Sequence, residues 1–222
     1  MSAKYWVYTD YDGTVTLDDN QVKILDAFAP PGWREKEYAI LEAGGKSLQY
    51  LPVIYADFAC RDQGRIIQFI REEVRPDPCF PEFARYCRHV GLPLEILSDG
   101  MHFYIEDYLR RFGLEDLVYY SNVVRVDEEG FHFTHPHSNP ECNKCGTCKK
   151  QKVVAKKAEG YKVIFIGDGL SDQCAAGEAD LLFAKKKLAA YCRENGIPYI
   201  PYETFCQVLE YVRSEVKPDA AQ

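Results

Sequence analysis

The sequence has no apolar run that approaches the roughly 20 residues needed to cross a bilayer, which argues against a membrane-spanning helix. Its first residues lead directly into an apolar stretch, without the basic segment and hydrophobic core of a secretory signal. No internal repeat or low-complexity segment is evident. We therefore expect a cytoplasmic globular protein with no membrane partner.

An excess of positive charge is also absent. The 222 residues carry 27 Lys and Arg against 34 Asp and Glu, a formal net charge of -7 at pH 7. Nonspecific binding to nucleic acid depends on clustered Lys and Arg that displace counterions, so no nucleic acid partner is expected. Hydrophobic residues make up 46% of the chain, an ordinary share for a protein with one sizeable core. Monomer and homodimer both remain open.

Disulfides are not expected among the nine cysteines. A chain without an export signal keeps its thiols reduced, and isolated cysteines then act mostly as small core hydrophobes. Six cysteines have no close partner in the sequence: Cys60, Cys79, Cys87, Cys174, Cys192 and Cys206. The other three lie together between residues 142 and 148.

Apolar runs alternate with amphipathic segments along much of the chain. The runs at 5–8, 94–97, 161–166 and 181–184 are typical of buried strands, and the segments between them predict crossover helices. Strand, loop and helix in this order favour an α/β fold, a Rossmann-like parallel sheet with helices on both faces.

Two segments interrupt this alternation. Residues 18–77 show helical patterns throughout, so we expect a small helical domain inserted into a core of residues 1–17 and 78–222. Residues 118–137 carry apolar runs on both sides of the turn residues 127–130, which predicts an inserted β-hairpin.

Polar residues follow three of the predicted strands at the point where each ends. Asp10 and Asp12 follow the first, Ser98 the second, and Asp168 and Asp172 the third. Because ligands bind at the carboxyl ends of parallel strands, we expect these side chains to converge at one edge of the sheet. Unrelated acidic turns that never meet are the alternative. Several buried carboxylates need a compensating cation, and their oxygen ligands suit Mg²⁺.

A positive group for an anionic substrate is expected from Lys149. It begins a basic helix predicted over 149–158, where the helix N-terminus itself favours anions. Carboxylates, a hydroxyl, an ammonium group and a metal ion together are typical of a phosphoryl-transfer site.

These residues resemble the four motifs of the haloacid dehalogenase (HAD) superfamily of phosphatases. The matching segments, in the order of the superfamily, are Asp10-x-Asp12-Gly13-Thr14-x-Thr16, Ser98, Lys149 and Gly167-Asp168-Gly169-x-x-Asp172. The resemblance implies a HAD-like core, and the helical insertion at 18–77 resembles the small α-helical cap of the phosphoserine phosphatase branch.

The resemblance also implies roles for the matched residues. Asp10 would be the nucleophile that takes the phosphoryl group as an aspartyl phosphate, and would ligate Mg²⁺. Asp12 would protonate the leaving alcohol and then activate water, with its backbone carbonyl on the metal. Asp168 would be a metal ligand, and Asp172 would orient Lys149 or a metal-bound water.

Phosphate oxygens would be held by Ser98 and Lys149, with Gly100 and neighbouring amides completing the cradle. Asp99 adds a negative charge beside this cradle. We expect its side chain to point away from the phosphate, with contact to metal or substrate as the alternative.

A narrower resemblance concerns the methionine-salvage phosphatases of the superfamily, and it implies a small phosphorylated methylthio ketone as substrate. The segments that carry it are 9–14, 19–20, 28–33, 148–149, 183–184 and 192–194. The alternatives are phosphoserine phosphatase and other small-metabolite phosphomonoesterases. A phosphate-binding regulatory module without turnover is a further, less favoured alternative. Five side chains in the insertion could contact the leaving group: Trp33, Arg34, Lys36, Tyr50 and Tyr55. For each of them, ordinary packing or solvation of a helix is the alternative.

Residues 135–148, here called the cysteine loop, have spacing that suits a structural zinc site. His137, Cys142, Cys145 and Cys148 would be the four ligands of tetrahedral Zn²⁺, separate from the catalytic Mg²⁺. A loop of reduced thiols without a role is the alternative, and a redox switch that acts on Lys149 through Cys148 is a third hypothesis.

Overall fold

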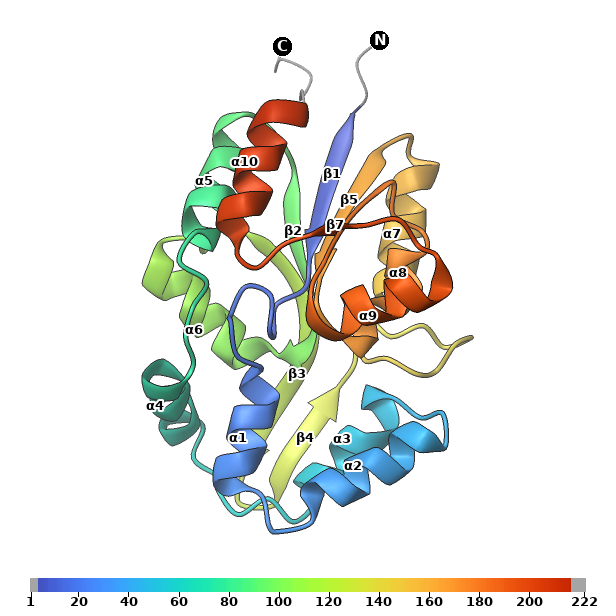
Figure 1. Cartoon of the computed structure of the whole chain (residues 1–222). Helices are drawn as coiled ribbons and strands as arrows, with labels where there is room; N and C mark the ends of the chain where they lie inside the picture. Colours follow the sequence, from blue (N-terminus) through green and yellow to red (C-terminus); the bar gives the residue numbers. More distant parts are fainter. Residues whose placement is uncertain (1–3, 217–222) are drawn as a thin grey trace.

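The computed structural model describes residues 4–216, and a seven-stranded sheet runs through its centre (Figure 1). The strands lie side by side in the order β4-β3-β2-β1-β5-β6-β7, and every neighbouring pair is parallel except β3 with β4. The strands are β1 (Tyr5–Thr9), β2 (Leu94–Met101), β3 (Val118–Asp127), β4 (Gly130–Thr134), β5 (Lys162–Gly167), β6 (Leu181–Ala184) and β7 (Ile200–Pro201). The predicted α/β class and parallel sheet are confirmed.

Helices cover both faces of this sheet. Figure 1 shows α5, α6 and α10 on one side and α7, α8 and α9 on the other. Alternate residues of β5 pack into two separate apolar clusters, Ile164 and Ile166 into one, Val163 and Phe165 into the other. Because both faces are buried, the strand reads as an unbroken apolar run. The helices are α1 (Asn20–Phe28), α2 (Trp33–Glu42), α3 (Ser47–Tyr55), α4 (Gln63–Glu73), α5 (Phe80–His89), α6 (His102–Phe112), α7 (Lys149–Ala158), α8 (Gln173–Ala176), α9 (Lys186–Asn195) and α10 (Phe205–Glu215).

Strand β2 is longer than the sequence predicts, and β3 takes part in both the parallel sheet and the hairpin. β2 continues past Leu97 to Met101, and its register with β3 shifts between these two residues. The first half of β3 pairs in parallel with β2, and its second half pairs with β4 in the hairpin. The hairpin is therefore an extension of a sheet strand rather than a separate insertion.

Helices α1 and α3 flank β4, α2 packs on α3, and α4 lies apart from them, between α1 and α6 (Figure 1). The chain leaves and re-enters the sheet region through two neighbouring segments. Thr16 and Pro76 form an antiparallel bridge, and Leu17 N donates to Arg75 O at 2.9 Å. The guanidinium of Arg75 also pairs with Asp18 at 2.8 Å. The two segments that flank the helices α1 to α4 are thus bonded to each other, and Pro52 lies inside α3.

The prediction that all cysteines are reduced is wrong for one pair. Cys79 and Cys206 form a disulfide across 127 residues of sequence, where the starts of α5 and α10 meet. Asp77 holds the same junction, because its carboxylate accepts hydrogen bonds from Cys79 N (2.9 Å) and Phe205 N (3.0 Å). Because the two cysteines are far apart in the sequence, no local pattern indicates that they are neighbours. Cys174 is exposed rather than in the core, whereas Cys60, Cys87 and Cys192 are buried as predicted.

No helix within residues 4–216 has the length and hydrophobicity needed to span a bilayer.

Candidate active site

Asp10 stands directly after β1 and is buried. Its Oδ1 lies 2.7 Å from Lys149 Nζ and accepts a hydrogen bond from Tyr11 N at 2.7 Å. Gly13 lets the chain turn sharply behind it, with φ at +74°. A Cβ at this glycine would lie 2.3 Å from Asp168 Oδ2, so a larger residue here would displace the Asp168 carboxylate.

The Asp12 carboxylate lies in a set of hydrogen-bond donors. Asn20 donates to Oδ1 from both its backbone N (3.1 Å) and its Nδ2 (2.8 Å), and Tyr104 OH donates to Oδ2 at 3.0 Å. Burial raises the pKa of Asp12 to about 7, and the charge of Asp19 adds to this, while the hydrogen bonds from Asn20 and Tyr104 oppose it. A carboxyl group with a pKa near neutrality suits proton transfer in both directions.

Lys149 is the first residue of α7, and its side chain reaches the edge of the sheet as predicted. Only 2% of it is exposed, and Nζ lies 2.7 Å from Asp10 Oδ1 and 2.7 Å from Asp172 Oδ1. It also donates to Ser171 Oγ at 3.1 Å. Burial lowers the pKa of Lys149, but the charges of Asp10, Asp172 and Asp99 outweigh burial, and the net pKa lies above its usual value. The ammonium group is therefore charged.

Three carboxylates form a cluster that fits a metal ion. Asp10, Asp168 and Asp172 each offer one oxygen, and these oxygens lie within 4.8 Å of one another. Burial raises the pKa of both Asp10 and Asp168, and the charge of Asp172 adds to the rise in each. Oxygen ligands of this kind suit Mg²⁺, which would lower these pKa values by neutralising the charges. The Asp12 carboxylate faces Asn20 and Tyr104 instead, so its predicted contribution to a metal would have to come from its backbone carbonyl.

Asp172 also stabilises the loop that follows β5. Its Oδ2 accepts hydrogen bonds from Asp168 N (3.1 Å) and Gly169 N (3.0 Å), which folds the loop after β5 around the carboxylate. Lys186 approaches from α9, with Nζ 3.1 Å from Asp168 Oδ2 and 2.9 Å from Gly13 O. Sequence reasoning missed Lys186, because three consecutive lysines are typical of a solvated face.

Ser98 and Gly100 lie next to Asp12, within β2 rather than after it. Ser98 Oγ accepts a hydrogen bond from Gly100 N at 2.9 Å and lies 3.4 Å from Asp12 Oδ2. A Cβ on Gly100 would lie 2.0 Å from Tyr104 OH and 2.4 Å from Asp12 Oδ2. The structure therefore brings the three predicted motifs of the sheet edge and Lys149 together. Asn20 and Tyr104 also belong to this site. They were not predicted from the sequence, because neither their residue type nor their spacing from the motifs indicates a role.

The Asp99 carboxylate bonds to other segments of the chain. Its Oδ1 accepts from Thr147 N at 2.7 Å, and its Oδ2 accepts from Ser47 Oγ at 2.8 Å. The side chain thus lies between α3 and the cysteine loop.

The cysteine loop does not form the predicted zinc site. Across residues 4–216, three or more ligating atoms cluster in two places, at Asp10, Asp168 and Asp172 and at Asp127, Glu129 and His132. The predicted ligands, His137, Cys142, Cys145 and Cys148, are in neither place. Backbone bonds hold the loop instead: His137 pairs with Thr147, and Cys148 N donates to His137 O at 2.9 Å. Cys142 is exposed, and burial raises the pKa of Cys145 to about 12, so that thiol stays neutral.

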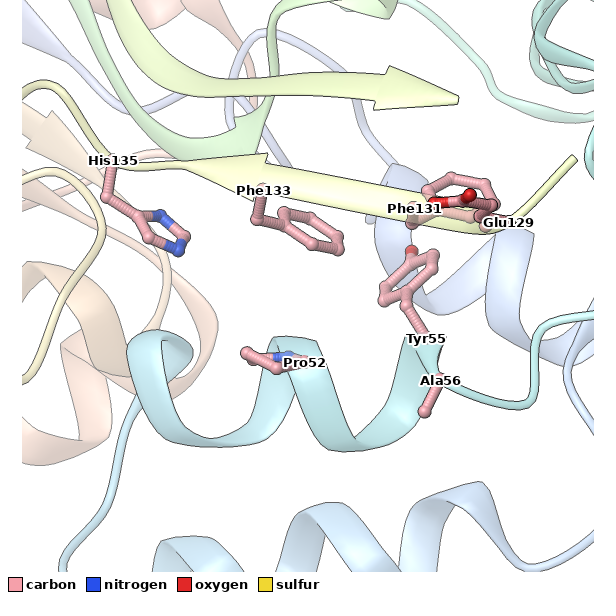
Figure 2. A pocket seen from close by; sticks show the side chains of 8 residues that line it. Pro52, Tyr55, Ala56, Glu129, Phe131, Phe133 and His135 are labelled. Carbon is pink, nitrogen blue, oxygen red and sulfur yellow. The ribbon is translucent and has the colours of Figure 1, made fainter. Parts of the chain in front are cut away.

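A cavity of about 230 Å³ lies between α3 and β4 (Figure 2). Its walls are mostly aromatic and small side chains: Pro52, Tyr55, Ala56, Glu129, Gly130, Phe131, Phe133 and His135. Figure 2 shows Pro52 and Tyr55 rising from the helix toward Phe131 and Phe133 on the strand. The ring of Tyr55 lies 4.9 Å from that of Phe131 and 5.3 Å from that of Phe133, between centroids.

Hydrogen bonds join one end of this cavity to the edge of the sheet that carries the site. His135 Nδ1 lies 2.6 Å from Asn122 Oδ1, and Asn122 Nδ2 donates to Asp99 O at 2.6 Å. Two hydrogen bonds therefore link the cavity wall to the Ser98–Gly100 segment.

Comparison with known proteins agrees with this geometry. A family model for haloacid dehalogenase-like hydrolases matches residues 7–177. A protein of Brevibacillus brevis named 2-hydroxy-3-keto-5-methylthiopentenyl-1-phosphate phosphatase is 34% identical, over 97% of this chain and 100% of its own length. A protein of the same name from Geobacillus kaustophilus is 32% identical, over 95% of this chain and 96% of its own. Among solved structures, a phospho-aspartyl intermediate analogue of phosphoserine phosphatase superposes with a TM-score of 0.68 at 16% identity, covering 95% of this chain and 99% of that one.

Proposed function

The chain belongs to the haloacid dehalogenase-like hydrolase family and is a phosphatase, and we propose that it forms an aspartyl phosphate on Asp10 with Mg²⁺ as its cofactor. The observation that carries this proposal is the position of Lys149, buried between Asp10 and Asp172 at 2.7 Å from each. A charged ammonium group at this place can hold an oxygen of a transferring phosphoryl group beside the nucleophile.

In the first half-reaction, the Asp10 carboxylate attacks phosphorus and the bond from phosphorus to the alcohol oxygen breaks. Asp12, whose pKa is about 7, gives its proton to the departing oxygen. Lys149 and Ser98 Oγ hold oxygens of the phosphoryl group, and the amide of Gly100 fixes Ser98 Oγ by donating to it at 2.9 Å. Mg²⁺ bound by Asp10 and Asp168, with Asp172 beside them, would supply neutralisation of the phosphate charge.

In the second half-reaction, the Asp12 carboxylate takes a proton from water, and the water oxygen attacks the phosphorus of the aspartyl phosphate. The acyl phosphate bond breaks, Asp10 is restored as a carboxylate, and inorganic phosphate leaves. The hydrogen bonds from Asn20 and Tyr104 keep the Asp12 carboxylate fixed through both transfers.

Residues 18–77 would act as a cap over this site, inserted into a core of residues 1–17 and 78–222. Support comes from the paired connections, where Leu17 N donates to Arg75 O and Asp18 pairs with Arg75. The side chains of α3 that line the cavity would then contact the part of the substrate that leaves with the alcohol.

For the substrate, we propose 2-hydroxy-3-keto-5-methylthiopentenyl 1-phosphate. The two relatives named for this substrate match nearly the whole chain. The aromatic walls of the cavity suit an apolar methylthio tail. A phosphoserine phosphatase must pair both a carboxylate and an ammonium group, whereas the cavity offers the carboxylate of Glu129 and a His135 whose pKa is lowered by burial. The solved phosphoserine phosphatase shares the fold at 16% identity.

A substrate panel tests this choice. We expect the methylthio ketone phosphate to exceed phosphoserine in kcat/KM by about 100-fold, since a fitted apolar pocket discriminates by that order. Phe133→Ala should raise KM for the methylthio ketone phosphate and leave KM unchanged for an analogue that lacks the methylthio group. A preference for phosphoserine, or equal effects of Phe133→Ala on both compounds, would reject the assignment of this substrate.

A further inference from the structure

Asp99 connects four segments that are distant in the sequence. Its carboxylate accepts hydrogen bonds from Ser47 Oγ at the start of α3 (2.8 Å) and from Thr147 N in the cysteine loop (2.7 Å). Its backbone carbonyl accepts from Gln21 Nε2 of α1 (2.9 Å) and from Asn122 Nδ2 of β3 (2.6 Å). No step of the mechanism above uses this carboxylate.

We propose that Asp99 is a positioning residue that couples the seating of the cap to the placement of Lys149. The inference rests on the proposed function, since it assigns Lys149 to the phosphoryl group and residues 18–77 to the cap. The Asp99 carboxylate bonds to Ser47 and Thr147 rather than to the nucleophile or the proton donor, and it acts through the two segments that it joins.

The first segment leads to Lys149. Thr147, which donates to Asp99, lies two residues before Lys149 and is fully buried. Lys149 N in turn donates to Thr147 O at 3.0 Å, and Cys148 N is held by His137 O at 2.9 Å. A displacement of Thr147 would therefore move the first turn of α7 and the ammonium group with it. A bond to a carboxylate is about twice as strong as one to a neutral acceptor, which suits it to hold this segment.

The second segment is the start of α3. Ser47 is 2% exposed, and its Oγ donates to Asp99 while it accepts from Gly146 N at 3.0 Å. Two further bonds join the same end of α3 to the same loop: Leu48 N donates to Lys144 O (3.2 Å), and Gln49 Nε2 donates to Asn143 O (2.8 Å). The cap helix and the lysine segment thus meet at one carboxylate.

The position of α3 explains why this coupling would matter to the reaction. The same helix contributes Pro52 and Tyr55 to the wall of the cavity. A leaving group that fills the cavity would fix the position of α3. Through the bond from Ser47 to Asp99, the position of α3 would then determine the positions of Thr147 and Lys149. Burial raises the pKa of Asp99, and the charge of Lys149 together with the hydrogen bonds from Thr147 and Ser47 opposes that rise.

The test compares phosphate release by wild type, Asp99→Ala, Ser47→Ala and the double variant, with inhibition by orthovanadate as the second readout. Vanadate mimics the phosphoryl group in transfer, and its Ki does not depend on the fraction of enzyme that is active. Asp99→Ala is expected to lower kcat/KM by about 10- to 100-fold and to raise the vanadate Ki by a similar factor, because Lys149 is misplaced. Ser47→Ala should lower kcat/KM by about tenfold.

The double variant should be no worse than Asp99→Ala within about twofold, since the contribution of Ser47 runs through Asp99. Asp99→Asn keeps the side-chain volume and an acceptor for Thr147 N, so it should fall between wild type and Asp99→Ala, and it carries the test if the alanine variant does not fold. The matched control is Ser138→Ala in the same loop, where Ser138 Oγ bonds to His135 O and not to Asp99. Its kinetic constants should equal those of wild type.

A fall in kcat with an unchanged vanadate Ki would mean that Asp99 has a merely structural role, and would overturn the proposal. Effects of Ser47→Ala and Asp99→Ala that multiply would also overturn it, because the two residues would then act separately. Wild-type enzyme that releases no phosphate would instead reject the proposed function, whereas active wild type with an equally active Asp99→Ala rejects the coupling alone.

Discussion

Replacement of Lys149 by alanine tests the electrostatic centre of the site. The side chain is 2% exposed, and it lies between two carboxylates at 2.7 Å from each. Removing a preorganised donor to a transferring group lowers kcat by about 10²- to 10³-fold, which corresponds to roughly 3 to 4 kcal/mol of transition-state stabilisation. Breaking a buried ion pair leaves an uncompensated charge, so the free energy of unfolding should fall by about 3 kcal/mol.

The assay measures phosphate release from a saturating substrate with Mg²⁺ present, together with urea unfolding of the same samples. The neighbouring Lys150 supplies the matched control, since its side chain is about half exposed and pairs with Glu178 on the surface. Lys150→Ala should leave kcat unchanged and alter stability by less than about 0.5 kcal/mol. Added Mg²⁺ should restore part of the stability of Lys149→Ala by offsetting the charges of Asp10 and Asp172, but not its rate.

Equal rates for Lys149→Ala and Lys150→Ala would refute the reasoning, because the buried ammonium group would then play no part in phosphoryl transfer. A Lys149→Ala protein that is inactive but as stable as wild type would refute the part of the reasoning that concerns the buried charges.

Three further predictions concern residues around the site and the scaffold. Tyr104→Phe removes the donor to Asp12 Oδ2 and should lower kcat/KM by about tenfold, the worth of a hydrogen bond to a charged group; an unchanged value would contradict the role given to this bond. Asp18→Asn should lower the free energy of unfolding by about 1 kcal/mol at pH 7, because Arg75 holds the pKa of Asp18 down at about 2. That difference should disappear as the pH falls from about 4 toward 2, and a difference that grows in acid would be inconsistent with the ion pair. Cys206→Ser should cost about 2 to 4 kcal/mol in urea unfolding, since its disulfide closes a loop across 127 residues, and a reductant should impose the same cost on wild type but not on the variant.

Much of the fold follows from local patterns in the sequence. Within the strand at 162–167, residues 163–166 form an unbroken apolar run because both faces of the strand are buried, and helix α7 begins at the lysine where a basic helix is predicted. The two acidic motifs could be placed at one edge because parallel strands present their carboxyl ends together. The location of a side chain that directly follows a strand could therefore be predicted from the sequence.

Features that depend on contacts between distant segments could not be predicted in this way. Tyr104 and Asn20 reach Asp12 from two different helices, and no spacing in the sequence relates them. The disulfide of Cys79 forms because α5 and α10 begin side by side, which the order of elements does not reveal. The spacing of the cysteine loop resembled a metal site, yet backbone hydrogen bonds hold that loop in the structure.

The central claim is that Asp10 carries the phosphoryl group during turnover. Its most direct test is mass spectrometry of protein quenched in acid while substrate and Mg²⁺ are in excess, with Asp26→Asn, an exposed carboxylate paired with Arg34, as the matched control for Asp10→Asn. We expect a phosphoryl adduct on the peptide that contains Asp10 in wild type and in the control, and neither adduct nor phosphate release in Asp10→Asn. An adduct on another residue, or release of phosphate by Asp10→Asn at the wild-type rate, would contradict the claim.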